Sequence, residues 1–213
     1  MIPDRFVTEY PARCLALLDE MEPIARDKDM LGSFALLTAG SILNIPLERL
    51  SRHHPINGEF ESELYHSLRG VKKQPWAAAN FWQGKDAGQW HFARIVTDPN
   101  QVSGWQNEKG QPSMADAANT IGDRRTDMVL RVLRNALAHG NVVYLNEHGH
   151  ETAGTRLHSI GFLSRYEEST EQRAAAQTYR LIAVSENDFV NFVRCWAGWL
   201  SGFSGDYDLV ETV

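Results

Sequence analysis

The chain has 213 residues, 43% of them hydrophobic, which suits one domain with a substantial buried core. Its 21 basic and 27 acidic residues give a formal charge of −6, which argues against a protein that coats nucleic acid non-specifically but leaves room for a local basic cleft. The N-terminus has no signal-peptide pattern, and no apolar run approaches the roughly 18 residues of a membrane span, so we expect a cytoplasmic protein without membrane contact.

The first part of the chain predicts two helices. Apolar residues recur at helical spacing over residues 10–24, with Pro11 near the first turn. Residues 30–43 are apolar nearly all round, which predicts a buried central helix that ends or kinks at Pro46. Cys14 lies in the first of these helices and Cys195 in another apolar helical pattern, so we interpret both as buried free thiols in a reducing compartment.

Residues 51–112 predict short elements, because glycines and prolines interrupt the segment repeatedly. Residues 61–68 fit one helix, and residues 89–96 fit a strand or extended segment. The segment is too aromatic for a disordered linker, and we interpret it as an ordered insertion that packs on the helices or roofs the site. Core packing is the simpler interpretation of most of its aromatic residues, and base stacking is the alternative. These residues are Trp76, Phe81, Trp82, Trp90, Phe92 and Trp105.

The second part of the chain mixes helices and strands. Residues 115–139 predict a helix that stops at Gly140, and strands follow at residues 141–145, 156–166 and 177–184. Ser185 is typical of a helix N-cap, and an apolar stripe over residues 189–200 predicts the last helix. The predicted fold is therefore mainly α, an antiparallel helical bundle with a small antiparallel β-sheet inserted before the last long helix. Residues 1–213 form one domain, with insertions at 51–112 and 141–184.

The candidate chemistry lies at the end of the helix that stops at Gly140. Asn135 and His139 are four residues apart and share one face, whereas Arg134 lies about 140° from His139 on an ideal helix. A helix end, the long Arg side chain or a second subunit would have to close that gap. A histidine that moves a proton and an arginine that holds a phosphate are the parts needed to cleave a phosphodiester.

The run from Arg134 through Asn135 to His139 resembles the HEPN superfamily, whose hallmark is Arg, four to six residues and then His, with a polar residue favoured after the Arg. The residues from Arg13 onward, an Arg-Cys-Leu-Ala-Leu-Leu-Asp-Glu run before an apolar helix, also look like small prokaryotic HEPN proteins. The resemblance covers the helical parts of the chain. It implies a metal-independent endoribonuclease of a toxin–antitoxin or phage-defence system, with two protomers pairing their motif helices into one composite site.

On this interpretation Arg134, His139 and Asn135 are the catalytic residues, and Arg131 and Arg124 form a basic stripe that positions RNA. We expect no cofactor and no metal, because His148, His150 and His158 lack the paired spacing of a zinc site. Family members paired with a nucleotidyltransferase antitoxin often carry a Tyr two residues after the His. Asn141 stands there in this chain, so that type of antitoxin is not supported and other partners remain open.

The expected function is cleavage of RNA to 2′,3′-cyclic phosphate and 5′-OH ends by a homodimer, and a narrow substrate such as a tRNA loop would reconcile this with the acidic charge. Two alternatives stay open. One is a non-catalytic HEPN-like module that binds RNA, a nucleotide or a protein partner through Arg134 while His139 only caps the helix. The other is a structural dimerisation domain, in which neither residue serves any activity.

Overall fold

A computed structural model describes residues 6–51, 59–107, 109–114, 121–152, 157–165 and 178–203 of the protein. Within these residues the chain forms five α-helices, three short 3-10 helices and four strands. The α-helices are α1 (Phe6–Asp27), α2 (Leu31–Ser51), α3 (Glu59–Val71), α4 (Thr126–His139) and α5 (Glu186–Ser201). The strands are β1 (Trp90–Ile95), β2 (Val142–Leu145), β3 (Ser159–Arg165) and β4 (Tyr179–Val184).

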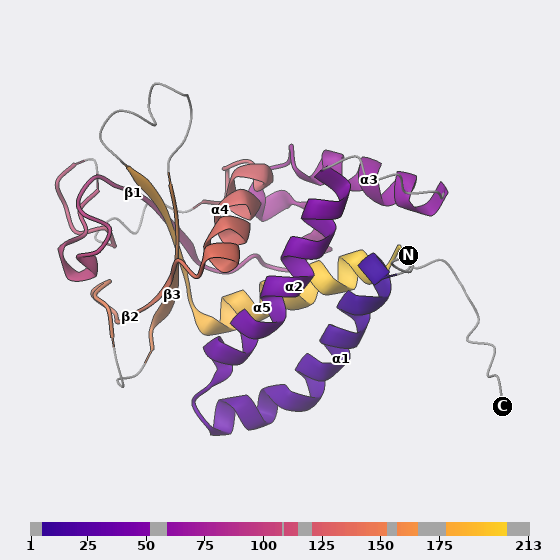
Figure 1. The fold of residues 1–213 in the computed structure, drawn as a ribbon, viewed down its shortest axis with the longest axis horizontal. Helices are drawn as coiled ribbons and strands as arrows, with labels where there is room; N and C mark the ends of the chain where they lie inside the picture. Colours follow the sequence, from indigo (N-terminus) through magenta and orange to yellow (C-terminus); the bar gives the residue numbers. More distant parts are fainter. Residues whose placement is uncertain are drawn as a thin grey trace.

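The four strands form one antiparallel sheet in the order β1-β4-β3-β2. The helices gather on one side of this sheet, with α4 packed directly against it, and the irregular segment that follows β1 covers the other side (Figure 1). Alternate strand residues therefore enter two separate cores. Residues such as Phe92 and Ile182 join the main core with the helices, whereas Ala93 and Leu181 join a smaller cluster with Trp105.

The prediction of a mainly α antiparallel bundle is wrong, because the protein is a helix-rich α/β mixture built around the sheet. The three strands expected after the motif helix are present, but the sheet gains a fourth strand, β1, from the segment between α3 and α4. β1 pairs with β4 along its whole length, from Trp90 opposite Val184 to Ile95 opposite Tyr179. Backbone pairing across such a sequence separation leaves no local mark in the sequence.

Of the two predicted effects of Pro46, an end or a kink, the helix end is absent, because α2 continues through the proline to Ser51. A proline inside a helix has no N–H to donate to the carbonyl four residues earlier, here that of Ile42. The indole Nε1 of Trp196, on α5, donates a hydrogen bond of 3.2 Å to that carbonyl. The helix therefore passes the proline without leaving a buried acceptor unpaired. α2 is also less buried than predicted, since Leu37 is 77% exposed.

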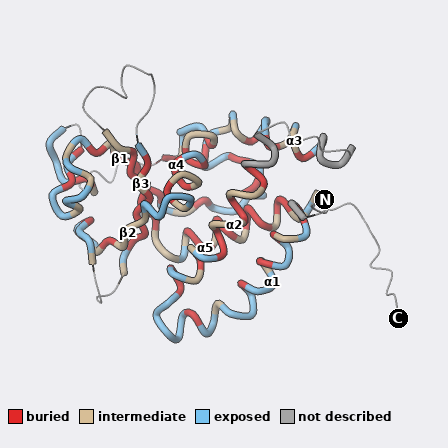
Figure 2. The backbone as a smooth tube through the Cα atoms, in the orientation of Figure 1, coloured by how far each residue is buried: buried red, intermediate tan, exposed pale blue. Residues whose placement is uncertain are grey.

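Most aromatic residues of the segment 76–105 are buried in the main core, which confirms core packing as their role, and Figure 2 shows where buried residues lie along the backbone. The ring of Trp76 lies at its centre, with centroids 5.0 Å from Trp90 and 5.3 Å from Phe192. Rings of this cluster meet mostly edge to face, the favoured geometry of aromatic pairs. Residues 76–92 therefore supply a central part of the core. The cluster comprises Trp76, Phe81, Trp82, Trp90, Phe192 and Trp196.

Several local predictions are confirmed. The Ser185 Oγ accepts a hydrogen bond of 3.1 Å from the Asp188 N–H and so caps α5. The two cysteines, Cys14 and Cys195, are buried and free. Among the described helices none is long and apolar enough to cross a membrane.

Candidate functional site

The motif helix α4 begins at Thr126, later than the predicted residue 115; residues 121–125 form turns, and residues 115–120 lie outside the described part. Its first N–H groups are paired by a neighbouring segment instead of a side-chain cap. The Thr126 N–H donates to the Gln74 carbonyl at 2.9 Å, and the Asp127 N–H donates to the Lys72 carbonyl at 3.1 Å. This pairing brings Lys72 beside the first turn of α4.

The C-terminal end of α4 is fixed as the sequence predicted. Gly140 adopts a left-handed conformation with φ of 71°, and its N–H donates to the Ala136 carbonyl. The Asn141 N–H donates to the same carbonyl at 2.9 Å, and the Asn141 carbonyl accepts from the Leu163 N–H of β3 at 3.0 Å. His139 is therefore exposed at the end of a helix that is anchored to the sheet.

Arg134 and Arg131 are close enough to Lys72 for their charges to act on it. Burial lowers the pKa of Lys72, the attraction of Asp127 opposes this shift, and the charges of Arg131 and Arg134 lower the pKa further. Lys72 is half-buried and Arg131 is exposed. Lys72 is thus within electrostatic range of one carboxylate and two arginines, and we call these four residues the α4 cationic cluster: Lys72, Asp127, Arg131 and Arg134.

Asn135 points to the sheet. Its Nδ2 donates a hydrogen bond of 3.2 Å to the Oγ of Ser164 on β3, whose residue is only 5% exposed. Because α4 is regular from Thr126 to His139, Asn135 and His139 share a face and Arg134 lies about 140° from His139. One copy of the helix therefore presents Arg134 and His139 in different directions.

Arg124 stands outside α4, so it is not part of a helical stripe. The carbonyl of Arg124 accepts a hydrogen bond of 2.8 Å from the Trp76 N–H, which ties it to the aromatic core. Its guanidinium carbon lies 3.6 Å from the centroid of the Phe92 ring on β1, a cation–π contact. Arg124 therefore contacts β1 just before α4 begins, whereas Asn135 on α4 contacts β3.

Neither Ser164 nor Lys72 was identified as a site residue from the sequence. Lys72 reaches the motif helix because its carbonyl accepts a hydrogen bond from the Asp127 N–H, and no local sequence pattern indicates this pairing. Ser164 lies in a predicted strand, and the alternation of that strand places it on the same face as Phe162. The identity of the helix that packs on that face could not be read from the strand itself.

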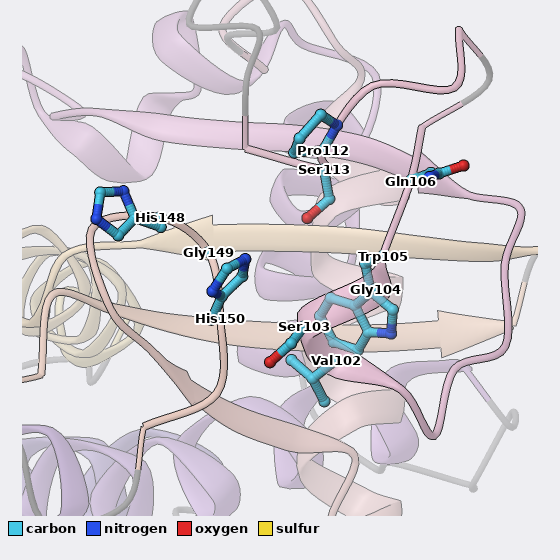
Figure 3. Close-up of a pocket in the computed structure, with 10 residues that line it drawn as sticks. All are labelled: Val102, Ser103, Gly104, Trp105, Gln106, Pro112, Ser113, His148, Gly149 and His150. Atoms are coloured by element: carbon cyan, nitrogen blue, oxygen red, sulfur yellow. The ribbon is translucent and has the colours of Figure 1, made fainter.

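A separate hollow lies on the far side of the sheet, where His148 and His150 approach Trp105 and Ser113 (Figure 3). The two imidazole centroids are 6.3 Å apart. The turn is held by the Asn146 Oδ1, which accepts the N–H groups of both histidines at 2.9 and 3.0 Å. Within the described ranges, no group of three or more His, Cys, Asp or Glu side chains could hold a metal ion.

No family model, curated protein or solved structure matches this chain.

Proposed function

We propose that the protein is a metal-independent endoribonuclease in which His139 moves protons and the α4 cationic cluster binds phosphate. The observation that carries the proposal is the arrangement around α4. An exposed histidine ends the helix that also carries Arg131 and Arg134, and Lys72 adds a third cation in a chain of formal charge −6. Clustered cations in an acidic protein fit a local site for a polyanion.

The chemistry follows from RNA itself, which carries the nucleophile as its 2′-OH. His139 acts as general base on this hydroxyl or as general acid on the leaving 5′-oxygen. Arg134 stabilises the charge that develops on the phosphorane, and a guanidinium is suited to two-pronged contacts with phosphate. The products are a 2′,3′-cyclic phosphate and a 5′-OH, and DNA resists because it lacks the nucleophile.

The different directions of Arg134 and His139 support a composite site in a symmetric homodimer. A two-fold axis beside α4 would place the arginine of one protomer near the histidine of the other. The resemblance in the motif implies the same pairing of helices. A toxin or phage-defence role, with an antitoxin as partner, rests on that resemblance alone.

The test is incubation of the purified protein with total tRNA and with a single-stranded RNA in EDTA, followed by mapping of the fragment ends. Wild type is compared with Arg134→Ala and His139→Ala, and with Arg13→Ala and His148→Ala as exposed controls on other elements. We expect both motif variants to cleave at least about 100-fold more slowly, as variants without general acid–base or charge-stabilising groups do. Both controls should cleave like wild type, and equal cleavage by all five proteins would reject the proposal.

A non-catalytic RNA-binding module is the second candidate, and one observation favours it. Arg134 lies about 140° from His139 around α4, so one protomer binds phosphate through Arg134 and Lys72 without needing the histidine. This alternative predicts that Arg134→Ala weakens RNA binding, that His139→Ala does not, and that wild type produces no fragments.

A further inference from the structure

Two arginines face each other on the sheet beside α4. Arg94 of β1 is the register partner of Arg180 of β4, and Arg180 is the partner of Ser164 of β3. The alternation of the strands places all three on the helix-facing side, because Phe92, Ile182 and Phe162 belong to the main core. We call this line across the three strands the sheet row: Arg94, Arg180 and Ser164.

The sheet row runs beside α4, as two contacts indicate. At one end Arg124, just before α4, lies over the ring of Phe92, two residues before Arg94 on the same face of β1. At the other end Asn135 of α4 donates its hydrogen bond to Ser164, the last member of the row. α4 packs against β3 and β4, and Arg124 just before it reaches β1, so the row borders the helix that carries Arg131 and His139.

Two arginine side chains stand at this border. Like charges directly opposite each other on neighbouring strands destabilise a sheet, and Arg180 is only 7% exposed. Arg94 also donates from Nε to the Thr178 Oγ1 at 3.3 Å, and both arginines have further contacts within the chain. The Nε bond to Thr178 fixes the direction of the half-buried Arg94 guanidinium, which preorganises it for an anion.

We propose that Arg94, backed by Arg180, binds backbone phosphates of the RNA away from the cleaved bond, so that the strand lies along α4 from His139 toward Arg124. This inference rests on the proposed function, because it takes RNA as the ligand. Arginine suits the role because its planar fork contacts phosphate oxygens in pairs. Contacts of this kind add affinity and fix the register of the strand without reading its bases.

The test measures binding of a fluorescent single-stranded RNA of about 12 nucleotides by anisotropy over a range of salt concentrations. His139→Ala serves as the parent protein, so that no cleavage intervenes. In this parent we expect Arg94→Gln to weaken binding and to reduce the slope of log affinity against log salt by about 0.7 for each phosphate that the side chain neutralises. Arg94→Lys should keep the slope because it keeps the charge, and Arg13→Gln should change nothing.

Thermal unfolding of each variant separates binding from stability. A lower Tm for Arg94→Gln with unchanged affinity and salt slope would overturn the inference, because the arginine would then serve only contacts within the chain. Cleavage by wild type would leave the proposed function intact in that case. Conversely, a reduced salt slope in Arg94→Gln, together with no cleavage of any RNA by wild type, would support the sheet row and reject the nuclease. Absence of RNA binding by the parent protein would overturn both.

Discussion

The aromatic core and the α4 cationic cluster meet at residues 72–76, and they are assembled in opposite ways. The core brings together rings from separate segments, so that the ring centroids of Trp76, Trp90 and Phe192 lie within 5.6 Å of one another. The motif residues are neighbours in sequence, yet the helix sends Arg134 and His139 in different directions. Apolar side chains that come together gain stability by burying surface, whereas like charges that come together repel each other. Substitutions in the core should therefore lower the stability of the fold, whereas removal of a cation from the cluster should raise it.

The largest expected effect is at the centre of the core. Trp76→Ala removes a side chain that is 1% exposed and should lower the free energy of unfolding by about 3–5 kcal/mol. Trp76→Phe is the matched variant. It keeps most of the packing and removes an indole N–H that has no partner among the described residues, so its cost should be much smaller. Urea denaturation measures both, and a decrease below about 1 kcal/mol for Trp76→Ala would contradict the central role of this ring.

A smaller effect is expected where the core supports α2. Trp196→Phe removes the donor to the Ile42 carbonyl, and we expect a decrease in stability of about 1–3 kcal/mol from the unpaired acceptor and the smaller ring. Pro46→Ala restores a helical N–H for the same carbonyl. The cost of Trp196→Phe should therefore fall by about 1 kcal/mol in the Pro46→Ala background, which a double-mutant cycle measures. An identical cost in both backgrounds would show that the indole does not compensate for the proline.

The smallest expected effect has the opposite sign. The pKa of Lys72 is lowered in the folded protein, so its charged form is favoured more in the unfolded chain and folding at neutral pH is opposed. This cost is present below the folded-state pKa and disappears as the pH rises through the unfolded-state value. The main cause is burial of the ammonium group, so Lys72→Gln should raise Tm slightly and weaken RNA binding. Lys73→Gln, at the exposed neighbouring lysine, is the control, and a lower Tm for Lys72→Gln would contradict a net cost of burying this charge.

The parts of the fold that were predictable from sequence are those that local chemistry specifies. Ser185 caps α5 through its own side chain, and Gly140 ends α4 through its own backbone freedom. The wrong predictions concern residues whose interaction partners lie far away in the sequence. Pro46 was expected to end or kink α2, but the helix continues, and the donor that replaces the missing N–H is Trp196 on another helix.

The candidate site divides along the same line. Arg131, Arg134, Asn135 and His139 were found from spacing on one helix. Lys72 and Ser164 join them through backbone pairing and sheet register, which the sequence does not display. The start of α4 was misplaced because residues 121–125 look helical but pair with the segment around Trp76.

The strand order carries a consequence for how the protein reaches its native state. β1 is the first strand to be synthesised and its only neighbour in the described sheet is β4, the last, so the intervening chain must close into a long loop before they pair. Such high contact order slows folding. During synthesis Trp76 and Trp90 leave the ribosome before Phe192. The nascent chain therefore exposes aromatic side chains that are prone to aggregation until Phe192 can pack against them.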